Sequence, residues 1–375
     1  MRTYRLVAVL AALLVVVSGA SSSAALEAEA LKSDNVKLLK NDNFGPGGDI
    51  AYDGRYVYAL ERGAEGGLHI YDPHSLKKLT FLKCPTYSDV KPLEKGMIVL
   101  DSVGSCLGAP AGVTVLDTRN LKRIKVLSST PVGKHTFRNY PGTRFVYMSM
   151  NGALGGPRRG AEPILDFSDP AKPKVHEFVS NGLGCHDVWI HSSKGKRIAA
   201  CAAGSETQIW DVSDPAAPVT LSRIPTPQTF FNHSAAISDD GKLLIVGDEA
   251  HGATECVGGP SGDIWAYDIS DPARPVLKSG FSLNRGTPVS SFWVDPENEW
   301  CSAHNYEFIP GTHTLVAGWY AGGMNVIDFS DAAAPKEIAY FMEDETSVWG
   351  AYWIEGRIWT SDDDRGVDVF GVKGL

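Results

Sequence analysis

The sequence has little positive charge and, after its first twenty residues, no long apolar run. Its 375 residues carry 35 Lys and Arg against 44 Asp and Glu, which gives a net charge of −9. Non-specific nucleic-acid binding needs a basic face, so this balance argues against a nucleic-acid partner. A membrane-spanning helix needs about 20 consecutive apolar residues. No stretch after the N-terminal segment meets that need, so we expect no stable membrane span in the processed chain.

Common catalytic signatures are also missing. The sequence contains no nucleophile elbow, no glycine-rich phosphate loop and no HExxH zinc helix. Therefore no single motif names an activity. Any active site must be assembled from side chains that the fold brings together.

The N-terminus has the pattern of a secretory signal peptide. Arg2 and Arg5 precede an apolar run over 6–17, and small residues follow at 18–20. We predict a signal peptide over 1–25 and a secreted or extracytoplasmic protein, with an uncleaved signal anchor as the alternative. In an exported chain, six cysteines can form up to three disulfides. Thiolate ligands for copper are the competing interpretation, which an oxidising compartment disfavours.

Glycine and proline are plentiful, with 39 and 22 residues, which favours short strands joined by turns. One motif returns along the chain as LDFSDPAKP (165–173), WDVSDPAAP (210–218), YDISDPARP (267–275) and IDFSDAAAP (327–335). Weaker copies bring the shared aspartates to seven: Asp72, Asp117, Asp166, Asp211, Asp268, Asp328 and Asp368. Their spacing of about 40 to 60 residues is typical of propeller blades.

Each repeat reads as four strands, so the sequence predicts an all-β, seven-bladed β-propeller as a single domain over 33–375. The last repeat stops soon after its third strand. The segment 33–39 resembles the missing turn and fourth strand, so we expect the N-terminal strand to complete the last blade and close the ring.

The stretch VIDFSDAAAPKEIAYF (326–341) and its sister repeats resemble the LVIVD-repeat family of exported bacterial and archaeal propellers. The resemblance covers essentially the whole chain after the signal peptide. It implies a propeller in an extracytoplasmic setting and implies no activity.

Four repeats share a histidine. When the repeats are aligned on the glycine of their first turn, the residues seven to nine positions upstream are Gly47, Asp89, His135, His186, His233, His304 and Trp349. The first strand of a blade lines the central channel, so the four histidines at successive entrances should point into one space. Neutral imidazoles bind Cu, Fe and Zn, and we predict a transition-metal site there. The alternative is that each histidine fastens a neighbouring blade through its backbone.

Further candidates surround this ring. Asp248, Glu249 and His251 lie in the long loop over 247–263 and could serve as acid, base or supports for the ligands. Tyr306 and Glu307 follow His304 on the same strand, whose alternation should turn only one of them toward the channel. We predict the disulfides Cys84–Cys106, Cys185–Cys201 and Cys256–Cys301, each contributing about 2–4 kcal/mol.

Two functions fit these observations. The first is a metal-dependent enzyme of oxidoreductase or lyase type that acts on a small molecule or saccharide at the channel mouth. A metal-free version of it would use a histidine and a tyrosine as base and acid. The second is a non-catalytic binding or adhesion module for a glycan, peptide or surface partner. The sequence indicates neither the substrate nor the oligomeric state.

Overall fold

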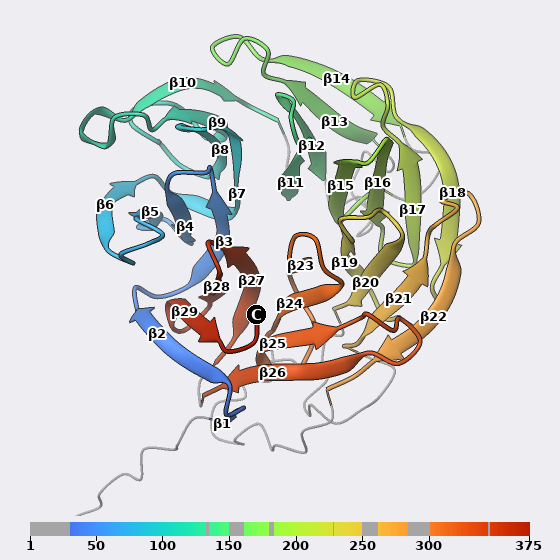
Figure 1. The fold of residues 1–375 in the computed structure, drawn as a ribbon. Coiled ribbons are helices and arrows are strands. Elements are labelled where there is room, and N and C mark those ends of the chain that lie inside the picture. The colour runs from blue at the N-terminus through green and yellow to red at the C-terminus, as the bar shows by residue number, and fades with distance from the viewer. Residues whose placement is uncertain are drawn as a thin grey trace, which may run out of the picture.

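Short β-rich stretches ended by glycine turns form seven antiparallel sheets arranged in a ring (Figure 1). This computed structural model describes residues 31–132, 135–149, 161–179, 184–227, 229–249, 262–283, 301–343 and 346–375. Over these residues the fold is all-β, with one short 3-10 helix, η1 (Leu121–Arg123). The predicted seven-bladed propeller is confirmed.

The blades are numbered in chain order, and their strands run from the axis to the rim. Blade 1 consists of β3 (Gly47–Tyr52), β4 (Val57–Glu61), β5 (Gly67–Tyr71) and β6 (Lys78–Lys83), and blade 2 of β7 (Thr86–Glu94), β8 (Met97–Ser102), β9 (Gly112–Asp117) and β10 (Lys125–Thr130). Blade 3 consists of β11 (Thr136–Asn139), β12 (Phe145–Ser149), β13 (Ala161–Asp166) and β14 (Lys174–Val179), and blade 4 of β15 (Asp187–Ser193), β16 (Lys196–Ala202), β17 (Glu206–Asp211) and β18 (Val219–Pro225). Blade 5 consists of β19 (Asn232–Ile237), β20 (Leu243–Asp248), β21 (Ile264–Asp268) and β22 (Val276–Phe281), and blade 6 of β23 (Tyr306–Phe308), β24 (Thr314–Trp319), β25 (Gly323–Asp328) and β26 (Lys336–Met342). Blade 7 consists of β27 (Val348–Ile354), β28 (Arg357–Asp362), β29 (Gly366–Val372) and β2 (Val36–Asp42).

The repeat aspartate ends the third strand of blades 2 to 6 and turns the chain, whereas Asp368 of blade 7 lies inside β29, opposite Asn41. The Oδ1 atom of Asp211 accepts a hydrogen bond from the backbone N–H of Ser213 at 2.8 Å, and Asp328 does the same for Ser330. This side-chain mimic of a backbone turn is the reason why aspartate recurs at the position.

The N-terminal strand closes the ring as expected. β2 pairs with β29, with Val36 opposite Val372 and Asn41 opposite Asp368, and so completes blade 7. One further pairing was not expected from the sequence: β1 (Leu31–Lys32) adds a fifth strand to blade 6 by pairing with β26. The segment over 31–42 therefore joins two neighbouring blades.

Adjacent blades are held together by apolar side chains between their sheets. Ile245 and Ala266 of blade 5 pack in one core cluster with Leu315 and Trp319 of blade 6, and all four are at most 1% exposed. Burial of this kind contributes about 25 cal/mol per Å² of apolar surface. It fixes the rotation of each blade relative to the next, and therefore where the inner strands point.

Two of the predicted disulfides are present. Cys84 pairs with Cys106 and Cys185 with Cys201. Cys301 is also disulfide-bonded, and its expected partner Cys256 lies outside the described residues. The predicted signal peptide lies outside them as well. Within the part of the chain that the structure describes, no helix is long and apolar enough to cross a membrane.

Candidate metal centre

Five aromatic rings form an arc where the first strands of blades 3 to 7 begin. The ring centroids of His135 and His186 are 4.4 Å apart, and those of His186 and His233 are 4.2 Å apart. The same 4.2 Å separates His233 from His304, and His304 from Trp349. The residues that align in the repeats therefore touch one another in space.

A carboxylate at the end of the second strand holds the segment that leads into the first strand. In blade 5, Asp248 accepts hydrogen bonds from the backbone N–H groups of Phe231 at 2.7 Å and Gly262 at 3.3 Å. Asp101 in blade 2 and Asp362 in blade 7 accept backbone N–H groups in the same way. Asp248 is fully buried and supports the strand entrance that carries His233.

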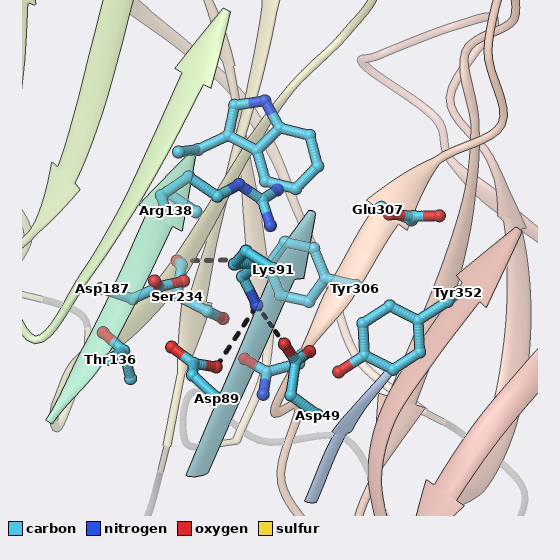
Figure 2. A pocket seen from close by; sticks show the side chains of 13 residues that line it. Asp49, Asp89, Lys91, Thr136, Arg138, Asp187, Ser234, Tyr306, Glu307 and Tyr352 are labelled. Atoms are coloured by element: carbon cyan, nitrogen blue, oxygen red, sulfur yellow. Dashed lines mark hydrogen bonds and ion pairs between the residues drawn. The ribbon is translucent and has the colours of Figure 1, made fainter. Parts of the chain in front are cut away.

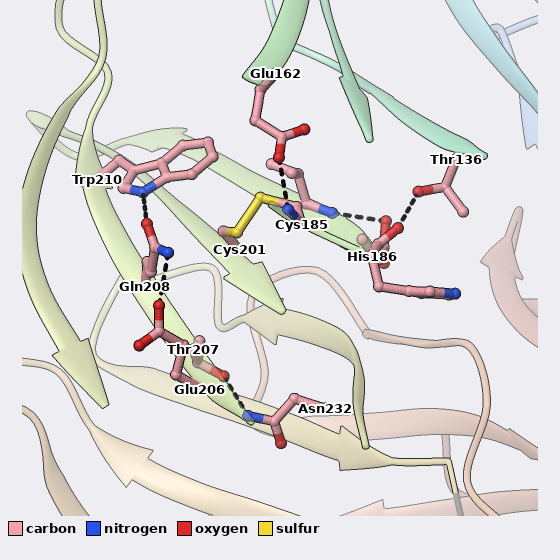
Figure 3. The surroundings of a disulfide bond; sticks show 12 residues. Thr136, Glu162, Cys185, His186, Cys201, Glu206, Thr207, Gln208, Trp210 and Asn232 are labelled. Atoms are coloured by element: carbon pink, nitrogen blue, oxygen red, sulfur yellow. Dashed lines mark hydrogen bonds between the residues drawn. A yellow bond between two sulfur atoms is a disulfide. The ribbon is translucent and has the colours of Figure 1, made fainter. Parts of the chain in front are cut away.

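The neighbouring blade fixes the tautomer of two histidines. Nδ1 of His186 lies 3.1 Å from the carbonyl oxygen of His233, and Nδ1 of His304 lies 2.5 Å from that of Trp349. A carbonyl oxygen only accepts, so Nδ1 carries the proton and Nε2 keeps its lone pair. The alternative in which a histidine fastens a neighbouring blade through its backbone therefore holds for both His186 and His304. It leaves Nε2 of each ring available to bind a metal. Figure 3 shows the imidazole of His186 extending away from the Cys185–Cys201 disulfide.

Glu249 brings a carboxylate into this arc. Its Oε2 lies 3.6 Å from Nε2 of His233, and its Oε1 lies 3.7 Å from Nε2 of His304. The hydroxyl of Tyr320 donates a 2.9 Å hydrogen bond to Oε1. Ligand atoms of His186, His233 and Glu249 all lie within 4.8 Å of one another. Two atoms bound to one ion at about 2.1 Å lie at most about 4.2 Å apart, so the separations in this group must shorten by up to about 0.6 Å when one ion binds.

Burial keeps these imidazoles neutral, which is the form that binds metals. It lowers the pKa of His186 and His304 well below the usual histidine value, and the neighbouring His233 adds to the effect. At the edge of the arc, burial lowers the pKa of His135 to about 4. The folded protein therefore holds these imidazoles away from water in their neutral form.

The other predicted site residues are distributed as follows. His135 contacts His186 edge-to-face and is not part of the His186–His233–Glu249 group, whereas His304 reaches Glu249. Tyr306 donates a 2.9 Å hydrogen bond to the carbonyl oxygen of Ser234 in blade 5. Glu307 lies deeper along the axis, and His251 lies outside the described residues.

Sequence reasoning placed Glu249 among acids, bases and supporting residues, whereas the structure places it beside two histidines as a candidate ligand. Tyr320, which orients Glu249, was not singled out. Its position directly after β24, in the loop on the histidine side, was the available signal. Asp89 occupies the aligned position of blade 2, but its carboxylate lies 3.3 Å from Nζ of Lys91.

Comparisons with known proteins add no family. A scan against protein-family models finds no match, and a search of curated proteins finds no similar sequence. The resemblance to the LVIVD-repeat family therefore stays a prediction, and the propeller fold rests on the structure.

Proposed function

We propose that this protein is an exported metal-dependent oxidoreductase that holds one transition-metal ion between His186, His233 and Glu249. The observation that carries the proposal is the mutual 4.8 Å grouping of two imidazoles and one carboxylate, all buried. Two histidines and one carboxylate that leave coordination positions open are typical of non-haem Fe(II) oxygenases, and the same donors also bind Zn. Iron is therefore the first candidate.

The chain's own residues would preorganise this site. The carbonyl oxygens of His233 and Trp349 orient the rings of His186 and His304, and the Tyr320 hydroxyl orients Glu249. Such outer partners typically contribute 10- to 100-fold to metal affinity. A bound metal would supply Lewis-acid and one-electron chemistry to a small molecule or saccharide at this mouth. The lyase version uses the same site without a redox step.

The disulfides support an extracytoplasmic location. Disulfides persist in oxidising compartments and are rare in the cytosol. Both described pairs lie at strand entrances of the propeller, where Cys185 directly precedes His186. Export of the protein, directed by a signal peptide over 1–25, accounts for the presence of both disulfides.

Elemental analysis of the purified protein tests the metal site. We expect about one iron or zinc ion per chain in the wild type, and loss of the ion in H186A, H233A and E249Q. The matched control is H313A. His313 is not part of this cluster, and its Nε2 lies 3.3 Å from the carboxylate of Asp240. Thermal unfolding with and without a chelator provides a second readout.

Two results would overturn the proposal. One is a wild-type protein that stays metal-free after incubation with Fe(II), Zn(II) and Cu(II). The other is stoichiometric metal that persists in H186A and E249Q. Either result would favour the non-catalytic binding module.

A further inference from the structure

The end of the ring axis opposite the histidines contains a cavity. Its volume is about 310 Å³, and a narrower space of about 30 Å³ continues from it toward the histidine side. Thr136, Asp187, Ser234 and Asn305, each directly after an arc histidine, line the narrow part. The wide part is lined further along the same first strands. The narrow part therefore ends beside the metal centre, but neither an arc histidine nor Glu249 lines the cavity.

Oppositely charged side chains face the cavity from opposite blades. Arg138 stands on β11 of blade 3, and Glu307 stands on β23 of blade 6. Figure 2 shows the two groups on opposite sides of the space, with Tyr352 beside Glu307. No ion pair joins them among the described residues.

The guanidinium of Arg138 has unused hydrogen-bonding capacity. It stacks on Trp189 at 3.6 Å from the ring centroid, which fixes its plane. It makes no side-chain hydrogen bond or ion pair with the part of the chain that the structure describes. An arginine fork held in one plane is suited to a carboxylate that accepts two parallel hydrogen bonds.

The opposite wall offers an acceptor. Oε1 of Glu307 accepts a 2.7 Å hydrogen bond from the backbone N–H of Trp353, which orients the carboxyl group. The nearby Lys91 does not compensate Glu307, because its ammonium group binds Asp49 and lies 3.3 Å from Asp89. The wide part of the cavity thus presents one donor fork and one carboxyl acceptor, whereas the carboxyl group of Asp187 lines only the narrow part.

The charges decide which ligand class fits. A simple anion would satisfy Arg138 but would face Glu307, and a simple cation would face Arg138. A zwitterion presents a carboxylate to the first and an ammonium group to the second, so both charges are matched. Apolar walls formed by Ile190, Trp353 and Ile354 would take an apolar side chain. The volume is at the lower end of ligand pockets, which requires a small molecule.

We propose that the far cavity binds a free α-amino acid with an apolar side chain, its carboxylate on Arg138 and its ammonium group on Glu307. The proposal does not depend on the metal site.

The test screens the twenty L-amino acids against the protein at pH 7 by saturation-transfer NMR, followed by titration calorimetry for the tightest. Its deaminated and decarboxylated analogues are matched probes, because each keeps the side chain and removes one charge. We expect saturable binding of the amino acid, and at least tenfold weaker binding of both analogues. R138Q and E307Q should each weaken binding at least tenfold.

Two variants make the result interpretable. R223Q removes an arginine on the outer strand β18 and should bind like the wild type. E249Q should also bind like the wild type, even if it has lost its metal, so the two proposals can fail separately. The proposal is overturned if none of the twenty amino acids binds. It is also overturned if either analogue binds as tightly, or if binding is unchanged in R138Q and lost in E249Q.

Discussion

The two ends of the ring axis are built from the same first strands and have opposite chemistry. At the histidine end, buried and neutral imidazoles contact one another, and those of His186 and His304 are hydrogen-bonded to backbone carbonyls. At the far end, charged side chains meet across a cavity. The histidines precede or begin their strands, whereas Lys91, Arg138 and Glu307 stand a few residues further along. Position along the strand therefore decides whether a side chain contacts the ring of the next blade or faces the far cavity.

The two ends also change the stability of the fold with pH in opposite directions. Burial lowers the pKa of His135 to about 4, so the unfolded chain binds the extra proton first and stability falls as the pH decreases from about 6.5 to 4. Burial raises the pKa of Glu307 to about 7, so the unfolded chain loses its proton first. Stability at the far end therefore falls as the pH increases from about 4.5 to 7.

The largest effect is expected at Lys91. Its ammonium group pairs with the buried Asp49, whereas burial raises the pKa of the neighbouring Asp89 to about 8, so K91M leaves the Asp49 carboxylate uncompensated inside the ring. We expect a loss of about 3–5 kcal/mol in the free energy of unfolding, measured by urea denaturation. The double variant K91M/D49N should recover part of it. K83M, at an exposed ion pair on β6, should stay within about 0.5 kcal/mol of the wild type. Equal losses in K91M and K83M would contradict the assignment.

The fold and the histidine end of the ring axis were predictable from the sequence. The aspartates of the repeat have a local cause, a turn within two residues, so their period reveals the blades. The pairs Cys84–Cys106 and Cys185–Cys201 are close in the chain and within one blade step. The alignment of the histidines followed from the same period.

Contacts between blades were not predictable. The pairing of Lys91 with Asp49, and the approach of Glu249 to His304, depend on the rotation of one blade relative to the next. Apolar packing between sheets sets that rotation, and no short-range pattern records it. For this reason the sequence identified the ring of histidines and did not identify Glu249 as a ligand or the charged far cavity.

The second-largest effect is expected when either disulfide is removed, and a comparison of the two distinguishes a loss of stability from a loss of metal binding. Removing Cys185–Cys201 or Cys84–Cys106 by double serine substitution should cost about 3 kcal/mol in each case, since the sequence separations are 16 and 22. The first pair borders His186, whereas the second borders blade 2, which has no histidine at its entrance. We therefore expect weaker metal binding for the first variant alone, measured by competition with a chelator. Equal loss of metal in both would show that the disulfide acts through global stability.

A smaller effect tests how Glu249 is oriented. Y320F removes the hydroxyl that donates to Glu249 and should weaken metal binding about tenfold, within the range known for such partners. Y306F is the matched control, because that hydroxyl donates to a backbone carbonyl of the adjacent blade. It should lower stability by about 1 kcal/mol and leave metal affinity unchanged. Unchanged metal affinity in Y320F would remove the tyrosine from the site.

The smallest effect concerns the pH response of the far end. E307Q keeps an oxygen acceptor for the Trp353 N–H and removes the ionisable group. Below pH 4 both proteins carry a neutral side chain, so their free energies of unfolding should be nearly equal. Above pH 7 the wild type must hold a buried carboxylate, so E307Q should be the more stable by about 1 kcal/mol, a modest value because the cavity opens to solvent. Urea denaturation of metal-free protein at pH 4 and pH 8 measures the difference, and parallel pH profiles would show that Glu307 titrates normally.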